Sequence, residues 1–145
     1  MANVFDVASY ILSKRGQMSA MKLQKLCYYA QAWSAVWDDC RLFPEEFEAW
    51  KNGPVCRPLY SRTRGQFIIT EEDEPGNPEE LTDEQKETVD AVLDYYGDKD
   101  AQWLSRLTHM EDPWKQARAG YKDGEHCENI ISVESMSEYY SSINQ

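Results

Sequence analysis

The stretch MKLQKLCYYAQAW, from Met21 to Trp33, carries the clearest helical signal in the sequence. Its apolar residues recur at intervals of three or four positions, which places them on one face of an α-helix. These residues are Leu23, Leu26, Ala30 and Trp33, and the pattern continues to Trp37. Ser19 stands just before the stretch, where its hydroxyl oxygen can accept a hydrogen bond from the first turn. The stretch therefore predicts a helix that is capped at Ser19 and includes Trp37.

Capping residues indicate further helices on either side of this stretch. Asn3 can cap a first helix that ends near Gly16. Thr82 and Gln85 form a capping box, and the helix that follows them ends at Gly97. Pro58 is expected as the first residue of a further helix, Asp100 and Asp112 as the caps of two more, with Pro113 as first residue after Asp112, and Ser132 or Ser135 at the start of a last one. The helix after Asp100 has Trp103, Leu104 and Leu107 on its apolar face.

Residues 47–55 can form either a short strand or a short helix. The run FEAWKN is too brief for its periodicity to distinguish the two, and Gly53 can close a helix or begin a turn with Pro54. The run QFIIT at 66–70 is rich in β-branched and aromatic residues, so it offers a pairing partner. We therefore favour a strand at 47–55 that pairs with 66–70.

The predicted elements together indicate a mainly α-helical protein. About six or seven helices surround one core, with a small β ribbon of two or three strands, and no alternation of strand and helix points to a parallel sheet. A chain of 145 residues fits one domain, so we expect residues 1–145 to form a single compact unit. The segment EEDEPGNPEE, residues 71–80, has six acids and two prolines and is expected to remain an exposed loop.

Charge is unevenly distributed along the chain. The net charge of -11 combines a net of +3 for residues 1–64 with a net of -14 for residues 65–145. An acidic surface repels the phosphate backbone and attracts a basic protein, so no direct binding to nucleic acid is expected. Neither a signal peptide nor a membrane-spanning segment is visible. The four cysteines form no Cys-x-x-Cys pair, which indicates a reduced, cytoplasmic protein.

The sequence lacks the common signatures of catalytic, cofactor and metal sites. It has no phosphate-binding glycine loop, no G-x-S-x-G elbow and no zinc-type cysteine spacing, so neither a cofactor nor a metal is expected. His126 lies in a polar loop beside Cys127. His109 lies at the end of a predicted helix, where an imidazolium can face the negative pole while the turn brings Trp114 near. Its role as a cap, a partner contact or an acid–base catalyst stays open.

The stretch EAWKNGPVCRPLY, residues 48–60, is expected to form a sharp corner between two elements. Its pairs Gly53-Pro54 and Arg57-Pro58 restrict the backbone at two points, which is a sufficient structural reason for their presence. The same stretch contains residue types that supply much of the binding energy at protein interfaces, namely Trp50, Arg57 and Tyr60. It is therefore interpreted first as a corner and second as a surface for a partner.

Three segments of the sequence occur in the same order as the conserved segments of one known family. They are MKLQKLCYYAQAW at 21–33, LFPEEFEAWKNGPVCRPLY at 42–60 and LSRLTHMEDPWKQAR at 104–118, and they resemble the Panacea domain, also called the SocA-like antitoxin domain. The closing IISVESMSEYY resembles the C-terminal helix of that family. The resemblance implies a small cytoplasmic bacterial or prophage protein that neutralises a toxin encoded beside it. It also implies a protein without enzymatic activity, and the segments leave no room for a fused DNA-binding module.

The residues and the resemblance lead to one expected function and two alternatives. The expected function is that of an antitoxin that neutralises a cognate protein toxin by direct binding. The first alternative is an adaptor that delivers the toxin to a ClpXP-type protease, and the second is a small hydrolase that uses His109. We expect the partner surface to include Trp50, Lys51, Arg57, Tyr60, His109 and Trp114, with Gly53, Pro54, Pro58 and Pro113 as structural positions.

Overall fold

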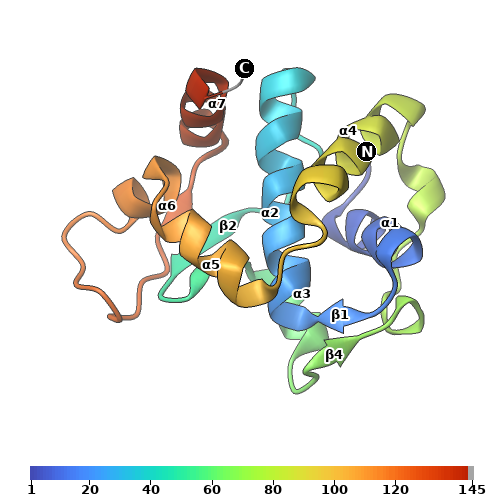
Figure 1. Ribbon diagram of the computed structural model, residues 1–145, viewed down its shortest axis with the longest axis horizontal. Helices are drawn as coiled ribbons and strands as arrows, with labels where there is room; N and C mark the ends of the chain where they lie inside the picture. Colours follow the sequence, from blue (N-terminus) through green and yellow to red (C-terminus); the bar gives the residue numbers. More distant parts are fainter. Residues whose placement is uncertain (144–145) are drawn as a thin grey trace.

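The computed structural model describes residues 1–143, and its longest helix, α2 (Ala20–Trp37), passes through the centre of the fold (Figure 1). Ser19 accepts a hydrogen bond from the Lys22 N–H (3.1 Å), which confirms the predicted cap. From Leu23 to Ala35 every residue of α2 is buried. A helix buried on all sides is typical of a core element, and here other helices and a strand surround it.

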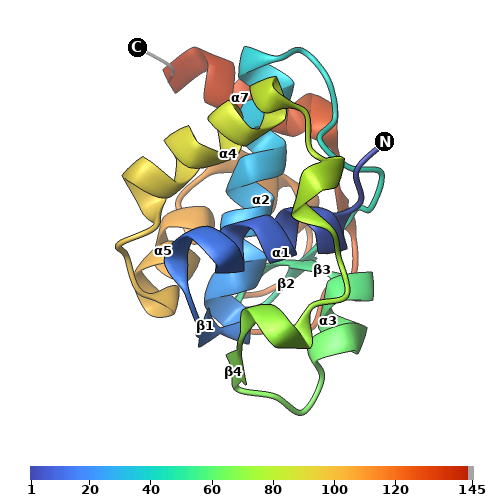
Figure 2. The ribbon, with the colours of Figure 1, turned by 90° about the vertical axis from the view of Figure 1, so that its right-hand side faces the viewer.

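Six further α-helices surround α2 in the described residues. They are α1 (Val4–Arg15), α3 (Arg57–Thr63), α4 (Asp83–Tyr96), α5 (Ala101–His109), α6 (Asp112–Ala117) and α7 (Val133–Ile143). Figure 1 shows α1 and α4 on one side of α2 and α5, α6 and α7 on the other, and in Figure 2 α1 crosses in front of α2. The prediction of a mainly helical, single compact domain is confirmed. Within residues 1–143, no helix is both long and apolar enough to cross a membrane.

The helix ends follow most of the predicted caps. Asn3 and Thr82 each head a capping box, and Asp100 accepts a hydrogen bond from a backbone N–H in the first turn of α5 (2.8 Å). The prediction for Asp112 is wrong by one residue, because α6 begins at Asp112 itself and Glu111 is the residue before the helix. Capping residues at these ends satisfy N–H groups that have no partner within the helix.

Helix α5 differs from the prediction at one aromatic residue. Trp103, expected on the apolar face, is 39% exposed, whereas Leu104 is fully buried. Neighbouring residues of a helix point about 100° apart, so one can be exposed while the next is buried. The Lys99 ammonium lies over the Trp103 ring, 5.3 Å from its centroid. Trp103 is therefore a surface residue.

The short strands form two small antiparallel sheets. Strand β1 (Met18–Ser19) pairs with β4 (Ile68–Ile69), while β2 (Phe47–Trp50) lies between β3 (Gly53–Cys56) and β5 (Ile130–Ile131). The strand expected within 47–55 is present, but its predicted pairing with 66–70 is wrong. Strand β2 pairs instead with β3, and Trp50 stands opposite Gly53 across a two-residue turn at 51–52. The turn expected to begin at Gly53 with Pro54 is therefore wrong, because both residues lie in β3. Gly53 has φ +117, a conformation that side chains disfavour.

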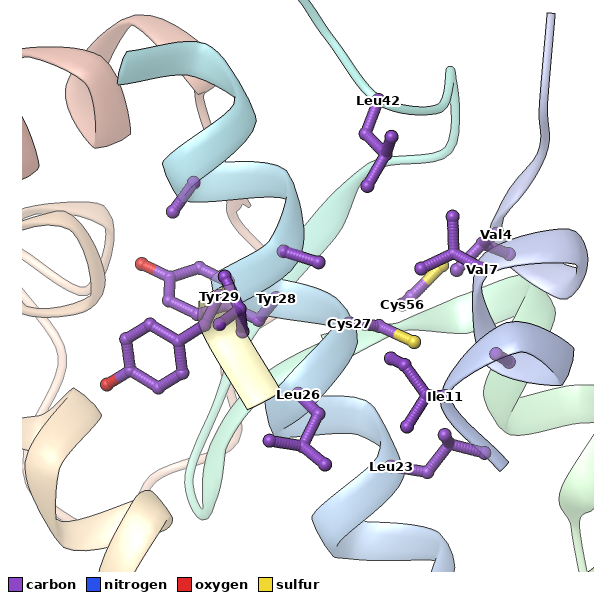
Figure 3. Packing of buried hydrophobic residues seen from close by; sticks show 14 of the residues in the cluster. Val4, Val7, Ile11, Leu23, Leu26, Cys27, Tyr28, Tyr29, Leu42 and Cys56 are labelled. Carbon is purple, nitrogen blue, oxygen red and sulfur yellow. The ribbon is translucent and has the colours of Figure 1, made fainter. Parts of the chain in front are cut away.

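Figure 3 shows where α1 and α2 meet in the core. The fully buried side chains there are Val4, Val7 and Ile11 of α1, Leu23 and Cys27 of α2, and Cys56 at the end of β3. Burial raises the pKa of the Cys27 thiol well above its usual value and that of Cys56 to about 12. Both thiols therefore stay protonated near neutral pH and act as small apolar packing groups.

A buried carboxylate joins α2 to α7. Glu111 Oε1 accepts a hydrogen bond from the hydroxyl of Tyr29 and another from that of Tyr140, both 2.7 Å long. Burial raises the pKa of Glu111, and the two hydroxyl donors oppose that effect. The Tyr29 ring also stacks on Tyr96 of α4, with ring centroids 4.0 Å apart. These contacts hold three helices against the centre of the fold.

The acidic segment 71–80 is largely exposed, as predicted from its composition, but it is more ordered than the predicted loop. It forms two 3-10 turns, η1 (Glu71–Asp73) and η2 (Pro78–Glu80), which lie against α1. The Asn77 N–H donates to Asp6 (2.8 Å). Gly76 approaches the backbone of Phe5 so closely that a Cβ would lie 2.1 Å from its oxygen. Backbone contacts with α1 therefore order a segment that has few apolar side chains to bury.

Candidate functional site: the β2–β3 hairpin and its cavity

The backbone of the β2–β3 hairpin is held in place by side chains from other parts of the chain. Four buried side chains donate to its carbonyl oxygens: Arg118 to Ala49 (2.8 Å), Trp114 Nε1 to Trp50 (2.8 Å), Ser105 Oγ to Asn52, and Lys25 Nζ to Pro54 (3.3 Å). These donors come from the segments 21–33 and 104–118, and their acceptors belong to 42–60. The three segments that resemble the Panacea domain are thus joined to one another at this hairpin.

Strand β3 is attached to α2 by two adjacent polar residues. The Gln24 side-chain amide accepts from the Cys56 N–H (2.8 Å) and donates to the Cys56 carbonyl oxygen (3.1 Å), as a neighbouring strand would. Gly53 lies so close to Lys25 that a Cβ at this position would be 2.5 Å from the lysine Cε. Any side chain at Gly53 would be strained by its φ of +117, and it would also force the buried Lys25 side chain to shift.

A cavity of about 340 Å³ opens between the hairpin, the start of α2 and α3. Trp50 and Tyr60 contribute aromatic walls, while Lys25, Lys51 and His126 contribute nitrogen atoms. None of its lining residues is an aspartate or a glutamate, although the chain has 26 acids and only 15 lysines and arginines. The cavity therefore contains two lysines and no carboxylate, on a protein that is acidic as a whole.

Aromatic and charged side chains cluster at the mouth of this cavity. The Trp50 and Tyr60 rings meet edge to face with centroids 4.9 Å apart, and the His126 ring lies 5.8 Å from Trp50. The Arg57 guanidinium lies 5.5 Å from the Trp50 ring centroid. Lys51, in the turn, is exposed and has no ion-pair partner among residues 1–143. We call Trp50, Lys51, Arg57, Tyr60 and His126 the hairpin face.

Two carboxylates fix the position of Arg57. Its guanidinium donates to both carboxylate oxygens of Glu48 (3.1 and 2.9 Å) and also contacts Glu128 (3.1 Å). The hydrogen bonds to Glu48 raise the pKa of Arg57 above its usual value. Glu48 in turn accepts from the Trp50 indole N–H (2.8 Å). The cation and the indole of the hairpin face are therefore oriented by the same carboxylate.

Lys25 is an unusual component of the cavity because its side chain is buried. It is 1% exposed, and Pro54 O is the one hydrogen-bond acceptor that its amine has within the described part of the chain. Burial lowers the pKa of Lys25 from 10.5 to about 7. Near neutral pH the amine is therefore present in both its neutral and its charged form.

His109 and Trp114 lie behind the hairpin rather than on the hairpin face. Their rings stack with centroids 4.0 Å apart, which confirms that the turn brings them together. Trp114 is 7% exposed and supports the hairpin through its bond to Trp50. His109 lines a second cavity of about 410 Å³ together with Met21 and Asn52, so it lies close to the hairpin turn.

The expected imidazolium at the end of α5 is not supported by the surroundings of His109. Its Nε2 is buried and has no hydrogen-bond partner among residues 1–143. Burial lowers the pKa of His109, and the nearby charges of Lys25 and Arg118 lower it further. The ring is therefore neutral near pH 7. Ser105 lines the same cavity, but its hydroxyl donates to Asn52 O, so this pair does not form a nucleophile with its base.

Sequence reasoning missed Lys25 and His126 as residues of this site. His126 is exposed and shares a hydrogen bond with Glu128 (2.7 Å), as expected for a polar loop, but the loop also brings its ring to Trp50. Lys25 could have been noticed as a charged residue next to Leu26 in a helix whose residues are mostly apolar or aromatic. Its burial depends on how the hairpin packs, which no local pattern reveals.

A comparison with known families matches the part of the chain that contains the hairpin. Residues 23–115 match the family described as Antitoxin SocA-like, Panacea domain. Comparisons with curated proteins and with solved structures gave no match. The matched region includes the whole hairpin and three of the side chains that hold it, Lys25, Ser105 and Trp114. The chain therefore belongs to the SocA-like antitoxin family that is defined by the Panacea domain.

Proposed function

We propose that this protein is the antitoxin of a toxin–antitoxin pair and that it neutralises its cognate toxin by direct binding through the hairpin face. The observation that carries the proposal is the cluster of Trp50, Arg57 and Tyr60 around an open cavity within the family's own segment. Tryptophan, tyrosine and arginine are the residue types most enriched among those that dominate binding energy. This surface is therefore the best candidate for the contact with the toxin.

The rigidity of the hairpin also supports a role in binding. Buried donors hold four of its carbonyl oxygens, and Glu48 orients both Arg57 and Trp50. A surface that is ordered before the partner arrives loses little conformational entropy on binding. Such a surface suits a stoichiometric inhibitor, whose affinity depends on slow dissociation.

The acidic second half of the chain would act at longer range. Asp83, Glu87 and Asp94 are exposed along α4, while Asp90 accepts a hydrogen bond from Tyr10 (2.8 Å). Charges of this kind attract a basic partner and raise its association rate, more strongly at low salt. We expect a basic toxin, whose association slows as the salt concentration rises.

The same proposal places the protein in the cytoplasm. All four cysteines are free thiols, and three of them are buried. Free thiols fit a reducing compartment. A toxin encoded beside the antitoxin would be met there soon after both are made.

Co-expression with the product of the neighbouring gene tests the proposal. The protein should rescue growth and should form a stable complex with that product in size-exclusion chromatography. Trp50→Ala should weaken the complex by roughly 30-fold, as expected for a dominant interface residue. Trp37→Ala is the matched control, because Trp37 is also partly exposed but lies twelve residues along α2 from Lys25, roughly 18 Å away.

Several results would contradict direct neutralisation or the choice of the hairpin face. Failure to rescue the cells, or rescue without a complex, would exclude binding as the mechanism. Equal loss of binding in Trp50→Ala and Trp37→Ala would exclude the hairpin face as the specific surface. Rescue that disappears in cells without a ClpXP-type protease would favour the adaptor mechanism, since occlusion of the toxin does not need a protease.

A further inference from the structure

The cavity of the hairpin face contains a charged group without a counter-charge. An ammonium has three N–H donors, and Lys25 has a single acceptor, Pro54 O, among the described residues. Its side chain is 1% exposed, so water has little access to the remaining donors. A buried polar group without partners costs free energy, and a buried charge costs more. The cavity next to Lys25 is the space from which an acceptor could approach it.

We propose that this cavity receives the carboxylate side chain of an aspartate or glutamate of the toxin, which pairs with the Lys25 ammonium. This inference rests on the proposed function and adds the chemistry of one contact. Within residues 1–143, Lys25 and Lys51 of the lining have no carboxylate partner, whereas His126 is already bonded to Glu128, so the charge that the two lysines lack is negative. A hydrogen bond between an ammonium and a carboxylate is shorter and stronger than one between neutral groups.

The walls of the cavity favour such a contact. Met21, Val55 and the Trp50 ring limit the access of water, and ion pairs are stronger where water is excluded. A volume of about 340 Å³ is at the lower end of the range for ligand pockets, about 300–1,000 Å³, which suits one inserted side chain. The cavity opens onto the hairpin face, so a side chain of a protein docked there reaches it directly.

The groups around Lys25 also determine how the contact depends on pH. They are Lys51 of the hairpin turn, Tyr60 of α3, His109 of α5, Arg118 after α6 and His126 before β5, and none is a carboxylate. Burial lowers the pKa of the free lysine to about 7, so binding a carboxylate above this pH requires uptake of a proton. The affinity contributed by this contact should therefore fall by roughly 90-fold from pH 6 to pH 9.

Calorimetric titration with the toxin from the neighbouring gene tests the contact. Wild-type protein should bind far more tightly at pH 6 than at pH 9. Lys25→Met should bind at least about 10-fold more weakly than wild type at pH 6 and should lose the pH-dependent part of the affinity. Lys14→Met serves as the control, because Lys14 is exposed at the end of α1. This substitution should change neither the affinity at pH 6 nor its dependence on pH.

The partner carboxylate can then be identified by single Asp→Asn and Glu→Gln substitutions in the toxin. One of them should weaken binding to wild type by about 10-fold and should have no further effect with Lys25→Met, as a double-mutant cycle requires for a direct pair. If Lys25→Met binds the toxin as wild type does, with the same pH dependence, the inference is wrong while the proposed function stands.

A second probe makes the inference testable without the toxin. In NMR spectra, propionate should raise the pKa of Lys25 and shift the Trp50 indole signal, whereas propionamide should do neither. A response to propionate together with no binding of the toxin would show a carboxylate site but overturn the toxin as its source. No response to propionate and no effect of Lys25→Met on toxin binding would overturn the carboxylate chemistry itself.

Discussion

Replacing Lys25 with methionine is expected to stabilise the protein, most strongly at low pH. Methionine keeps an unbranched stem of similar length but removes the amine. The amine has a single hydrogen bond, to Pro54 O, and burial lowers its pKa from 10.5 to about 7. Protonation of this amine in the folded state therefore opposes folding.

The size of this effect depends on pH in a defined way. The folded pKa is lower than the unfolded pKa, so the unfolded chain binds more protons between pH 7 and pH 10.5. The stability of the wild type therefore rises with pH through this window, and the full penalty is present below pH 7. The fall from 10.5 to about 7 corresponds to ~5 kcal/mol of unfolding free energy, of which roughly 2.5 kcal/mol is regained between pH 6 and pH 9.

Urea unfolding of wild type and Lys25→Met at several pH values measures this difference. The variant should be more stable at pH 6, and its advantage should shrink by about 2.5 kcal/mol by pH 9. Other titrating groups are common to both proteins, so their effects cancel in the difference. Lys14→Met should follow the wild type at every pH. An advantage that stays constant within about 0.5 kcal/mol would refute the burial of a lysine that titrates near neutrality.

Three other substitutions test separate parts of the structure by the same unfolding measurement. Gly53→Ala should destabilise the protein by about 2 kcal/mol or more, because Gly53 has φ +117 and a Cβ there would also displace the Lys25 side chain; an effect below about 0.5 kcal/mol would contradict the strained backbone at this position. Burial raises the pKa of Glu74 from 4.5 to about 7, and neither of its oxygens has a hydrogen-bond partner within residues 1–143. The folded state therefore binds more protons than the unfolded state, and the stability of the wild type falls as the pH rises from 4.5 to 7. The stability of Glu74→Gln relative to wild type should increase by up to ~3 kcal/mol across that window. A stability difference that does not change with pH would refute the raised pKa of Glu74. Tyr140→Phe should cost about 1–2 kcal/mol through its lost bond to Glu111, and no cost would show that this bond is dispensable.

The hairpin face could be predicted only in part from the sequence. Trp50, Arg57 and Tyr60 lie in one short stretch with two prolines, so their closeness follows from the chain itself. Lys25 and His126 come from distant segments, and they join the face because α2 and the loop before β5 pack against the hairpin. Spacing along the chain carries no information about such contacts.

Only the tertiary structure shows which of the predicted site residues support the hairpin and which lie on the hairpin face. His109 and Trp114 are neighbours because a helix ends between them, and the sequence predicted that closeness. Their place behind the hairpin, with Trp114 bonded to the backbone of Trp50, depends on how α5 and α6 pack. The sequence around a tryptophan does not show whether its indole donates to a buried backbone carbonyl or lies exposed for a partner.

The sequence by itself determined most of the helices and their caps, because a helix depends on residues within one or two turns of each other. It marked a change of direction near Gly53 but left open whether a helix or a strand precedes it, and it did not place the turn at residues 51–52. Only the tertiary structure decided that β2 pairs with β3 and β5, that the segment 71–80 packs on α1, and that Lys25 is buried beside an open cavity. These outcomes depend on the free energy of contacts between distant segments, and a local pattern does not contain that quantity.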